Sequence, residues 1–336
     1  MGSEALDQLL DDDLAEHDPV MLGHLSNHLP MALIALHAMG ADDTCLREYA
    51  NNYRSKLDQR RPLGQSIGLD DTLPLGSGVR YTDLLDRFDR EISAVGVQPV
   101  LDRHLGPLLE GLGGAAFHGV IRLGYAIEHG RSTDVSAGLA VLADCHLPIE
   151  VVGTGTATKP TADPQQLLDE VAAHSTIAGH SQVASGFQNA FGLVATDPTF
   201  RSLASGFVAD EDSLGTIARA SHRLSRATAN FFALHCVTAT HATRLATEHM
   251  TEPAARLDAV TALGRAVAAA YTVIGAPTAG AEPADDPGAP DWSQIRAEAV
   301  RQDDEHVIKI VYTSACEELR WEDPTYRYTA ARAVGL

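Results

Sequence analysis

Apolar side chains recur every three or four positions along most of the chain, which is the spacing that places them on one face of an α-helix. Residues 22–39 are a clear example, because leucines repeat at this spacing and Gly40 then provides a helix stop. We expect this helix to start near residues 26–27, with Asn27 as its N-cap and Pro30 in its first turn.

The same periodicity predicts further helices over almost the whole chain. The segment 212–249 is too long for one helix and is expected to break near 227–230. A Val-, Gly- and Thr-rich stretch within 147–160 is compatible with an extended segment. The remaining predicted helices cover residues 44–57, 81–95, 100–110, 117–128, 135–147, 164–175, 180–192, 199–207, 253–273, 292–319 and 325–334. The sequence therefore predicts an all-α, mainly helical fold, built as a single large multi-helix domain.

Two segments rich in Gly and Pro interrupt the helical pattern. We expect residues 58–80 to form a long ordered loop or a lid, and residues 275–290 a flexible linker or a lid, so both are candidates to cover a pocket. Residues 1–20 are acidic and lack the basic and apolar regions of a secretory signal. We expect them to form an N-terminal tail, followed by the helical domain over residues 21–336.

The composition favours a buried helical core and excludes some roles. Hydrophobic residues make up 45% of the 336 residues but aromatic residues only 5%, which suits packed helices better than a β-sandwich. The formal net charge of −20 repels phosphate groups, so we expect no binding to nucleic acid or to a membrane surface. No apolar run reaches the ~20 residues of a membrane span. The four cysteines lie far apart without a CxxC pair, which fits a reducing, cytoplasmic location.

Four of the fifteen histidines stand in apolar helical surroundings, namely His28, His118, His235 and His306. A buried imidazole costs desolvation free energy unless it is hydrogen-bonded or bound to a metal ion. Neutral imidazole is also a good ligand for iron, zinc, copper and nickel. These histidines are therefore either separately satisfied core residues or the ligands of one buried metal site. Because no short ligand spacing such as HExxH occurs, the pattern alone does not decide between the two.

Lys309 follows His306 by three residues and therefore projects from the same helix face. Its neighbours at 307–308 and 310–311 are all apolar, so the side chain either extends its amine to solvent or is held inside. Inside, desolvation would lower the pKa of the amine. A neutral amine can take up carbon dioxide and become a carbamate, which would give an all-histidine site an anionic oxygen ligand.

Four stretches of sequence carry these residues, in order, over residues 21–320. They are Asn27–His28 with the following Ala35–Ala41, then His118–Glu128, Leu234–Thr238 and Asp303–Lys309. In this pattern the chain resembles the questin oxidase-like family. No single stretch is decisive, but four in the right order are fairly specific.

The resemblance implies a non-haem Fe(II) centre held by four histidines and a carboxylated lysine, with dioxygen as co-substrate. Carried over by motif, the ligands would be His28, His118, His235, His306 and Lys309. The resemblance also implies oxidative opening of anthraquinone-type rings in polyketide biosynthesis, so the expected substrate is a small aromatic molecule. NADPH is a conceivable reductant, although the sequence shows no binding motif for it.

Three further residues on the predicted His118 helix are candidates for handling such a substrate. Tyr125 and Glu128 lie one turn apart and can orient a phenol or a ligand imidazole, unless they simply pack between helices. Arg122 can hold an anionic enolate.

Two other classes of function fit the same residues. In a zinc-dependent hydrolase, the histidines would hold zinc and activate water. In a non-catalytic helical binding protein, they would be ordinary core residues. Metal analysis combined with oxygen uptake separates the oxygenase from the hydrolase, and a metal-free protein of full stability would favour the binding protein.

Overall fold

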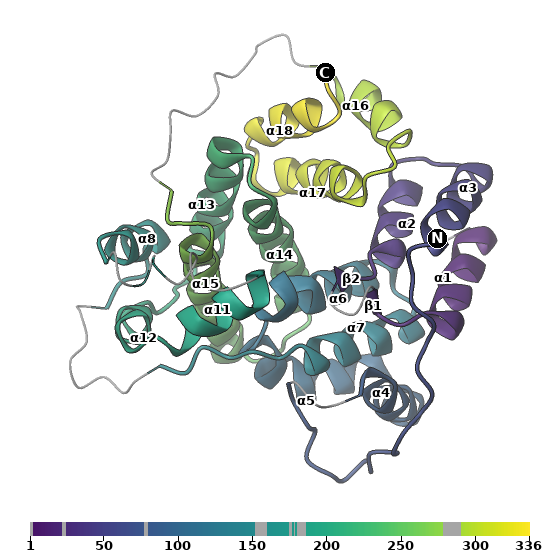
Figure 1. The fold of residues 1–336 in the computed structure, drawn as a ribbon, viewed down its shortest axis with the longest axis horizontal. Helices are drawn as coiled ribbons and strands as arrows, with labels where there is room; N and C mark the ends of the chain where they lie inside the picture. Colours follow the sequence, from purple (N-terminus) through teal and green to yellow (C-terminus); the bar gives the residue numbers. More distant parts are fainter. Residues whose placement is uncertain are drawn as a thin grey trace.

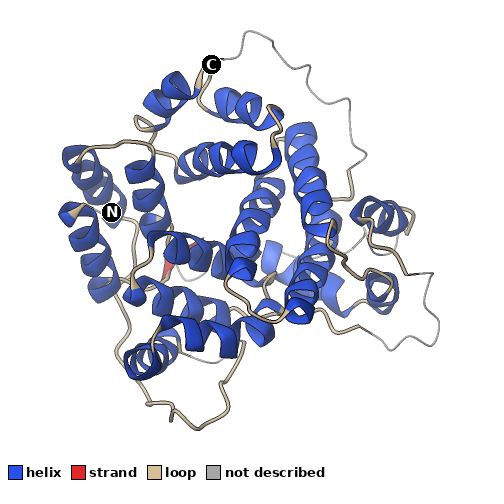
Figure 2. Ribbon diagram, turned by 180° about the vertical axis from the view of Figure 1, so that it is seen from behind, coloured by secondary structure: helices blue, strands red, loops and turns tan. Residues whose placement is uncertain are grey.

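The computed structural model describes residues 3–336 apart from 22–24, 77–79, 152–159, 175–176, 178, 180–185 and 278–289. The described part is mainly α-helical, with one antiparallel hairpin made of β1 (Val20–Met21) and β2 (Leu25–Ser26). Figure 1 shows the helices gathered around a common centre, and Figure 2 shows the short hairpin from behind. The predicted all-α fold is confirmed.

The helices contribute to one contiguous hydrophobic core. In chain order they are α1 (Glu4–Glu16), α2 (Leu29–Ala38), α3 (Asp43–Arg54), α4 (Tyr81–Val95), α5 (Val97–Leu109), the short η1 (Gly114–Phe117), α6 (His118–His129), α7 (Ser132–Asp144), α8 (Pro164–Ala172), α11 (Phe187–Thr196), α12 (Pro198–Ser205), α13 (Ser213–Thr228), α14 (Phe231–Glu248), α15 (Pro253–Val273), α16 (Trp292–Ala299), α17 (Glu305–Trp321) and α18 (Thr325–Ala333). Among the described helices, none combines the length and the apolar character needed to cross a membrane.

Helix α6 packs tightly between α7 and α14 because it carries glycines at both contacts. A Cβ atom at Gly119 would lie 2.7 Å from Cα of Leu142 on α7, and one at Gly124 would lie 2.7 Å from Cα of Ala242 on α14. Both distances are shorter than real Cβ contacts, so a larger residue would push the helices apart. This close packing fixes the position of α6, and therefore of His118 at its start.

The acidic N-terminal segment is a packed helix and not a tail. Residues 4–16 form α1, and its Leu6 and Leu10 are buried in the core. Ser3 caps the helix by accepting a hydrogen bond from the backbone N–H of Leu6. The expectation of a tail over residues 1–20 is therefore wrong for this segment.

Two long predicted helices have different outcomes. The expected break in 212–249 is confirmed, because α13 and α14 are separated at Ala229, whose φ is 47°. The predicted single helix over 292–319 is wrong, since α16 and α17 are separate helices. The carboxylate of Asp304 accepts the backbone N–H of His306 at 2.8 Å and so starts the second of them.

The loop over residues 58–80 is held against α4 where the structure describes it. Asp83 accepts the backbone N–H of Gly64 at 2.7 Å, and Arg87 donates to the carbonyl oxygen of Leu69 at 2.6 Å. In the other expected lid, 275–290, residues 278–289 lie outside the described residues.

Candidate metal centre

Four imidazoles and one amine from distant parts of the chain meet in the interior. The ring centroids of His28 and His118 are 4.6 Å apart, those of His118 and His235 4.8 Å, and those of His235 and His306 5.4 Å. Nζ of Lys309 lies 2.8 Å from Nδ1 of His28. The structure therefore brings together all five residues that the sequence selected. We call the four histidines the histidine cluster.

His28 is placed by the hydrogen bonds of its neighbour Asn27. The amide nitrogen of Asn27 donates to Asp13 on α1 at 2.9 Å, and its amide oxygen accepts the N–H of Leu29 at 2.9 Å. Helix α2 begins at Leu29, so His28 and not Asn27 occupies the N-cap position, while Pro30 lies in the first turn as predicted. Helix α1 thus contributes to the centre by anchoring the residue before His28.

His118 follows a strained turn at the start of α6. Ala115, Ala116 and Phe117 have φ values of 47°, 54° and 68°, in the left-handed region that residues with a Cβ atom rarely adopt. The turn directs the carbonyl oxygen of Ala115 to Nδ1 of His118, which donates to it. Gln188 accepts the N–H of Ala115 at 2.7 Å and ties the turn to α11. The surrounding structure therefore enforces a costly conformation that determines which nitrogen of His118 faces the interior.

The tautomers of His118 and His235 leave two nitrogen lone pairs facing each other. Nδ1 of His235 lies 2.8 Å from the carbonyl oxygen of Phe231. A carbonyl oxygen can only accept, so Nδ1 of each ring carries the proton and each Nε2 carries a lone pair. The two Nε2 atoms lie 3.2 Å apart, and His235 is completely buried. Neither nitrogen donates to the other in this pair of tautomers, and a cation shared between them would stabilise the contact.

Burial keeps the imidazoles neutral. Desolvation lowers the pKa of His118 to about 3 and that of His306 to about 4. It also holds the pKa values of His28 and His235 well below their ordinary range, with the charge of Lys309 as a further cause. A proton is therefore a poor cation for this place at neutral pH. A divalent transition-metal ion fits better, because it binds neutral imidazole whose other nitrogen is held by an oxygen acceptor.

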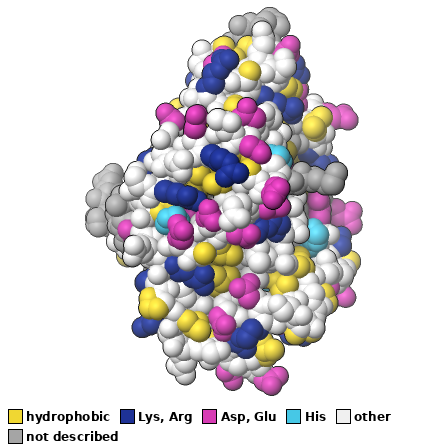
Figure 3. Space-filling model, turned by 90° about the vertical axis from the view of Figure 1, so that its right-hand side faces the viewer, with side chains coloured by type: hydrophobic (Ala, Val, Ile, Leu, Met, Phe, Trp, Pro, Cys, Tyr) yellow, Lys and Arg dark blue, Asp and Glu magenta, His cyan; other side chains and the backbone are white. Residues whose placement is uncertain are grey.

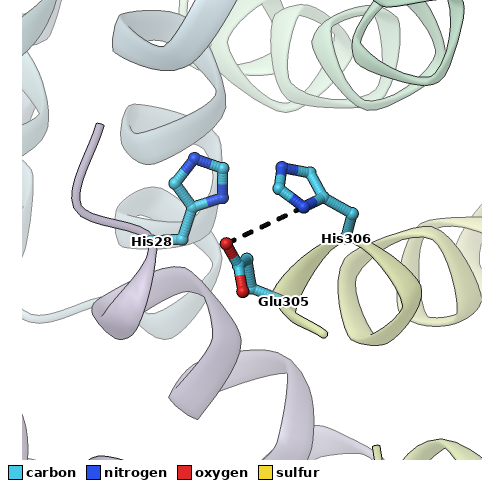
Figure 4. A group of neighbouring side chains, drawn as sticks. All are labelled: His28, Glu305 and His306. Atoms are coloured by element: carbon cyan, nitrogen blue, oxygen red, sulfur yellow. Dashed lines mark ion pairs between the residues drawn. The ribbon is translucent and has the colours of Figure 1, made fainter. Parts of the chain in front are cut away.

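Glu305 is a carboxylate at the cluster that the sequence reasoning missed. Its Oε1 lies 3.8 Å from Nδ1 of His306, and donor atoms of Glu305, His28 and His306 lie within 4.8 Å of one another (Figure 4). Nδ1 of His306 also lies 3.2 Å from Asp304, and the buried Nε2 of His306 has no hydrogen-bond partner. The signal in the sequence is the acidic run directly before His306, which is equally typical of a helix N-terminus.

The side chain of Lys309 is held inside the protein and does not extend its amine to solvent. It is completely buried on α17. Burial lowers the pKa of its amine to about 7, so a substantial share of the amine is neutral at neutral pH. The neutral amine is the form that reacts with carbon dioxide.

A cavity of about 740 Å³ opens onto the histidine cluster. Glu305 and three of the four histidines line it, and the rings of Phe187 and Phe232 stack at 4.2 Å in its wall. The other lining residues are Met21, Ser26, Ala115, Ala116, Gly186, Gln188, Asn189 and Phe231. A mostly apolar cavity of this volume suits a small molecule with several rings.

Arg122, Tyr125 and Glu128 do not line this cavity. Arg122 lies 3.8 Å from Asp13 on α1, the ring of Tyr125 packs against α17, and Glu128 is exposed beside α14. The structure therefore does not bring these three candidates to the centre. Helix packing, the alternative considered for Tyr125, accounts for its position.

A protein-family model described as Questin oxidase-like matches residues 25–314 of the 336 residues. No curated protein matches the chain. The matched range contains the histidine cluster, Glu305 and Lys309. The chain therefore belongs to the questin oxidase-like family.

Proposed function

We propose that this protein is a non-haem iron oxygenase that oxygenates or opens the ring of an aromatic, polyketide-like molecule. The observation that carries the proposal is the buried contact of two Nε2 lone pairs, 3.2 Å apart, on His118 and His235. The family supports an oxidative reaction, because it is named for an oxidase of an aromatic polyketide.

The residues of the centre have separate tasks in this proposal. The four imidazoles would hold Fe(II), and Lys309 would add an anionic oxygen after its amine takes up carbon dioxide and loses a proton. Bound there, Fe(II) would supply the one-electron chemistry with dioxygen that amino-acid side chains lack.

The cavity would select the substrate and exclude water. The rings of Phe187, Phe231 and Phe232 offer flat apolar faces on which an aromatic ring system can stack. Gln188 and Asn189 provide polar groups on the same wall, which can fix the orientation of ring oxygens. A bound molecule of this kind would displace water from the cavity and lie against the histidine cluster.

Anaerobic iron loading followed by oxygen uptake tests the proposal. We expect the protein to bind Fe(II) and to consume dioxygen when a hydroxyanthraquinone is added. His235→Ala and Lys309→Met should lose bound iron and oxygen uptake, because each removes a donor at the centre. His174→Ala is the matched control, because it changes an exposed histidine just after the end of α8. It should keep both the bound iron and the oxygen uptake.

Two results would contradict the proposal. One is unchanged iron content in both His235→Ala and Lys309→Met. The other is tight zinc binding with hydrolytic activity and no oxygen uptake from the iron-loaded protein, which would favour the zinc hydrolase.

A further inference from the structure

A second group of metal-ligating side chains lies apart from the histidine cluster. It consists of Glu128 on α6, His241 on α14 and Cys316 on α17, and we call it the Glu–His–Cys cluster. One donor atom from each residue lies within 4.8 Å of the donor atoms of the other two. The proposed function uses none of these three residues.

His241 directs a nitrogen without a hydrogen-bond partner toward this group. It is buried, and its Nδ1 lies 2.7 Å from Oε1 of Glu317. Because an ionised carboxylate can only accept, Nδ1 is the donor in this contact, and Nε2 is the nitrogen that faces the group. This Nε2 is buried without a hydrogen-bond partner and lies 4.0 Å from Oε2 of Glu128. A buried polar nitrogen without a partner is costly, so this position points to a missing ligand.

Glu317 holds the ring of His241 in this orientation. Its Oε1 also accepts from Arg244 at 3.0 Å, and its Oε2 accepts from the indole N–H of Trp321 at 2.5 Å. These contacts hold the pKa of Glu317 at about 2, because burial raises it by less than the hydrogen bond from His241 and the charge of Arg244 lower it. A carboxylate that receives Nδ1–H of a histidine is the usual partner of a metal-bound imidazole.

Cys316 supplies a sulfur donor on the same side. Its thiol is free and half-buried, and it shares a hydrogen bond with the hydroxyl of Tyr312. Burial raises the pKa of the thiol to about 12, so it is protonated in the absence of a metal ion. A bound cation would replace this proton, forming a sulfur–metal bond and releasing H⁺ to solvent.

We propose that Glu128, His241 and Cys316 form a second metal site, which takes a zinc-like divalent ion. One nitrogen, one sulfur and one carboxylate oxygen form a donor set that zinc prefers, and three protein ligands leave one position for water. Tetrahedral zinc places its donors about 3.3–3.7 Å apart. Glu128 is exposed, so its side chain can move the remaining distance at little cost.

The ion joins the three helices that also carry most of the histidine cluster. Glu128 shares α6 with His118, His241 shares α14 with His235, and Cys316 shares α17 with His306. A zinc ion at the Glu–His–Cys cluster therefore clamps these helices at a second point and stabilises the fold by mass action. This inference does not depend on the proposed function, because neither iron nor substrate enters it.

Cobalt(II) distinguishes the two sites, because the histidine cluster contains no sulfur. A Cys316–cobalt bond gives a thiolate-to-cobalt charge-transfer absorption in the near ultraviolet, whereas cobalt held by imidazoles alone does not. We expect this absorption when metal-free wild-type protein is titrated with cobalt(II), and we expect zinc to displace it. His235→Ala should keep the absorption, since it alters the other site. Cys45→Ser, which changes a half-buried cysteine outside both clusters, is the matched control and should also keep it.

The variants of the second site give the opposite result. Cys316→Ser should lose the thiolate absorption completely, and His241→Gln should weaken cobalt binding at least tenfold. Zinc should raise the melting temperature of wild type and Cys45→Ser by more than that of Cys316→Ser, which keeps only the histidine cluster, and circular dichroism should confirm that all variants are folded. No thiolate absorption in folded wild type, or its persistence in Cys316→Ser, would overturn the proposal.

Discussion

Glu305 places a negative charge beside four neutral imidazoles. The hydroxyl of Tyr53 forms a hydrogen bond with this carboxylate and lies 3.4 Å from the backbone nitrogen of His28, which donates to it. The carboxylate is thereby tied to the segment that carries one of the histidines. Glu305 thus offers the cluster an anionic oxygen that does not depend on the proposed carboxylation of Lys309.

Replacing Glu305 with glutamine should weaken metal binding without unfolding the protein. We expect the affinity of the histidine cluster for Fe(II) to fall by about 10–100-fold, because a neutral amide cannot offset the charge of a divalent ion. Competition with a chelator under anaerobic conditions measures this change. Asp303→Asn is the matched control, because Asp303 lies in the same acidic run but is exposed. Equal Fe(II) affinities in the two variants would show that Glu305 does not contribute to metal binding.

At the level of elements, the turn before α6 is the most strained feature near the cluster. Three consecutive residues with a Cβ atom adopt positive φ values there. Each such residue costs about 1–2 kcal/mol relative to a right-handed conformation. Gly114 just before the turn has no room for a side chain, because a Cβ atom would lie 1.6 Å from the carbonyl oxygen of Cys145. The turn is therefore held in place from both sides while it orients His118.

Ala115→Gly should stabilise the protein, contrary to the usual effect of glycine. Removing the Cβ atom at φ 47° relieves strain of about 1–2 kcal/mol, and the greater freedom of the unfolded chain offsets about half of this. We expect a net gain of about 0.5–1 kcal/mol in the free energy of unfolding, measured by urea denaturation. Ala94→Gly, at an exposed position in α4, should instead lose up to about 1 kcal/mol. A loss in both variants would show that the turn is not strained.

Sequence periodicity was sufficient to predict most of the helices, and the reason is visible in particular cases. The break between α13 and α14 was predictable because a pattern of that length exceeds one helix. The packing of α1 was missed because its acidic residues outnumber its leucines, although the spacing of Leu6 and Leu10 is helical. Periodicity does not reveal the division of 292–319, because charged residues such as Asp303 and Asp304 also occur within continuous helices.

The candidate site was predictable only in part. The four histidines and Lys309 stand in apolar surroundings, where a polar side chain is costly to bury. Bringing them together at one site lowers this cost, because they become partners for one another or for a shared ligand. Arg122, Tyr125 and Glu128 were placed by their spacing from His118, but spacing on one helix does not give the direction of the cavity. Glu305 had no signal of its own, because an acidic residue at a helix start is common for local reasons.

For the whole molecule, the formal net charge is −20. On the face in Figure 3, acidic and basic side chains are interspersed. Surface charges of this kind contribute little to stability individually. The response of the fold to acid therefore depends mainly on buried groups, and Glu317 is the buried carboxylate whose pKa is lowered most clearly, to about 2.

Glu317→Gln should destabilise the protein at neutral pH and flatten its response to acid. A carboxyl with a pKa of about 2 in the folded state and an ordinary value of about 4.5 when unfolded stabilises the fold fully above pH 4.5. This stabilisation is lost as the pH falls from 4.5 to 2. We expect a loss of about 3 kcal/mol at pH 7 and a much smaller difference from wild type near pH 2. Urea denaturation at a series of pH values, with a chelator present, measures it.

Glu110→Gln is the control for this experiment, because Glu110 is exposed. It should follow the wild-type curve at every pH. A constant difference between wild type and Glu317→Gln across the whole range would mean that the lost stability comes from packing and not from charge.

The positions of the ligand residues along the chain have a consequence for biosynthesis. His28 is made early, whereas His306 and Lys309 lie on α17, which leaves the ribosome only after fourteen other α-helices of the described chain. No nascent or truncated chain that lacks α17 can present the full set of donors. The metal centre that we propose would therefore be complete only after this helix is translated, and an unfinished polypeptide would not yet carry a centre able to react with dioxygen.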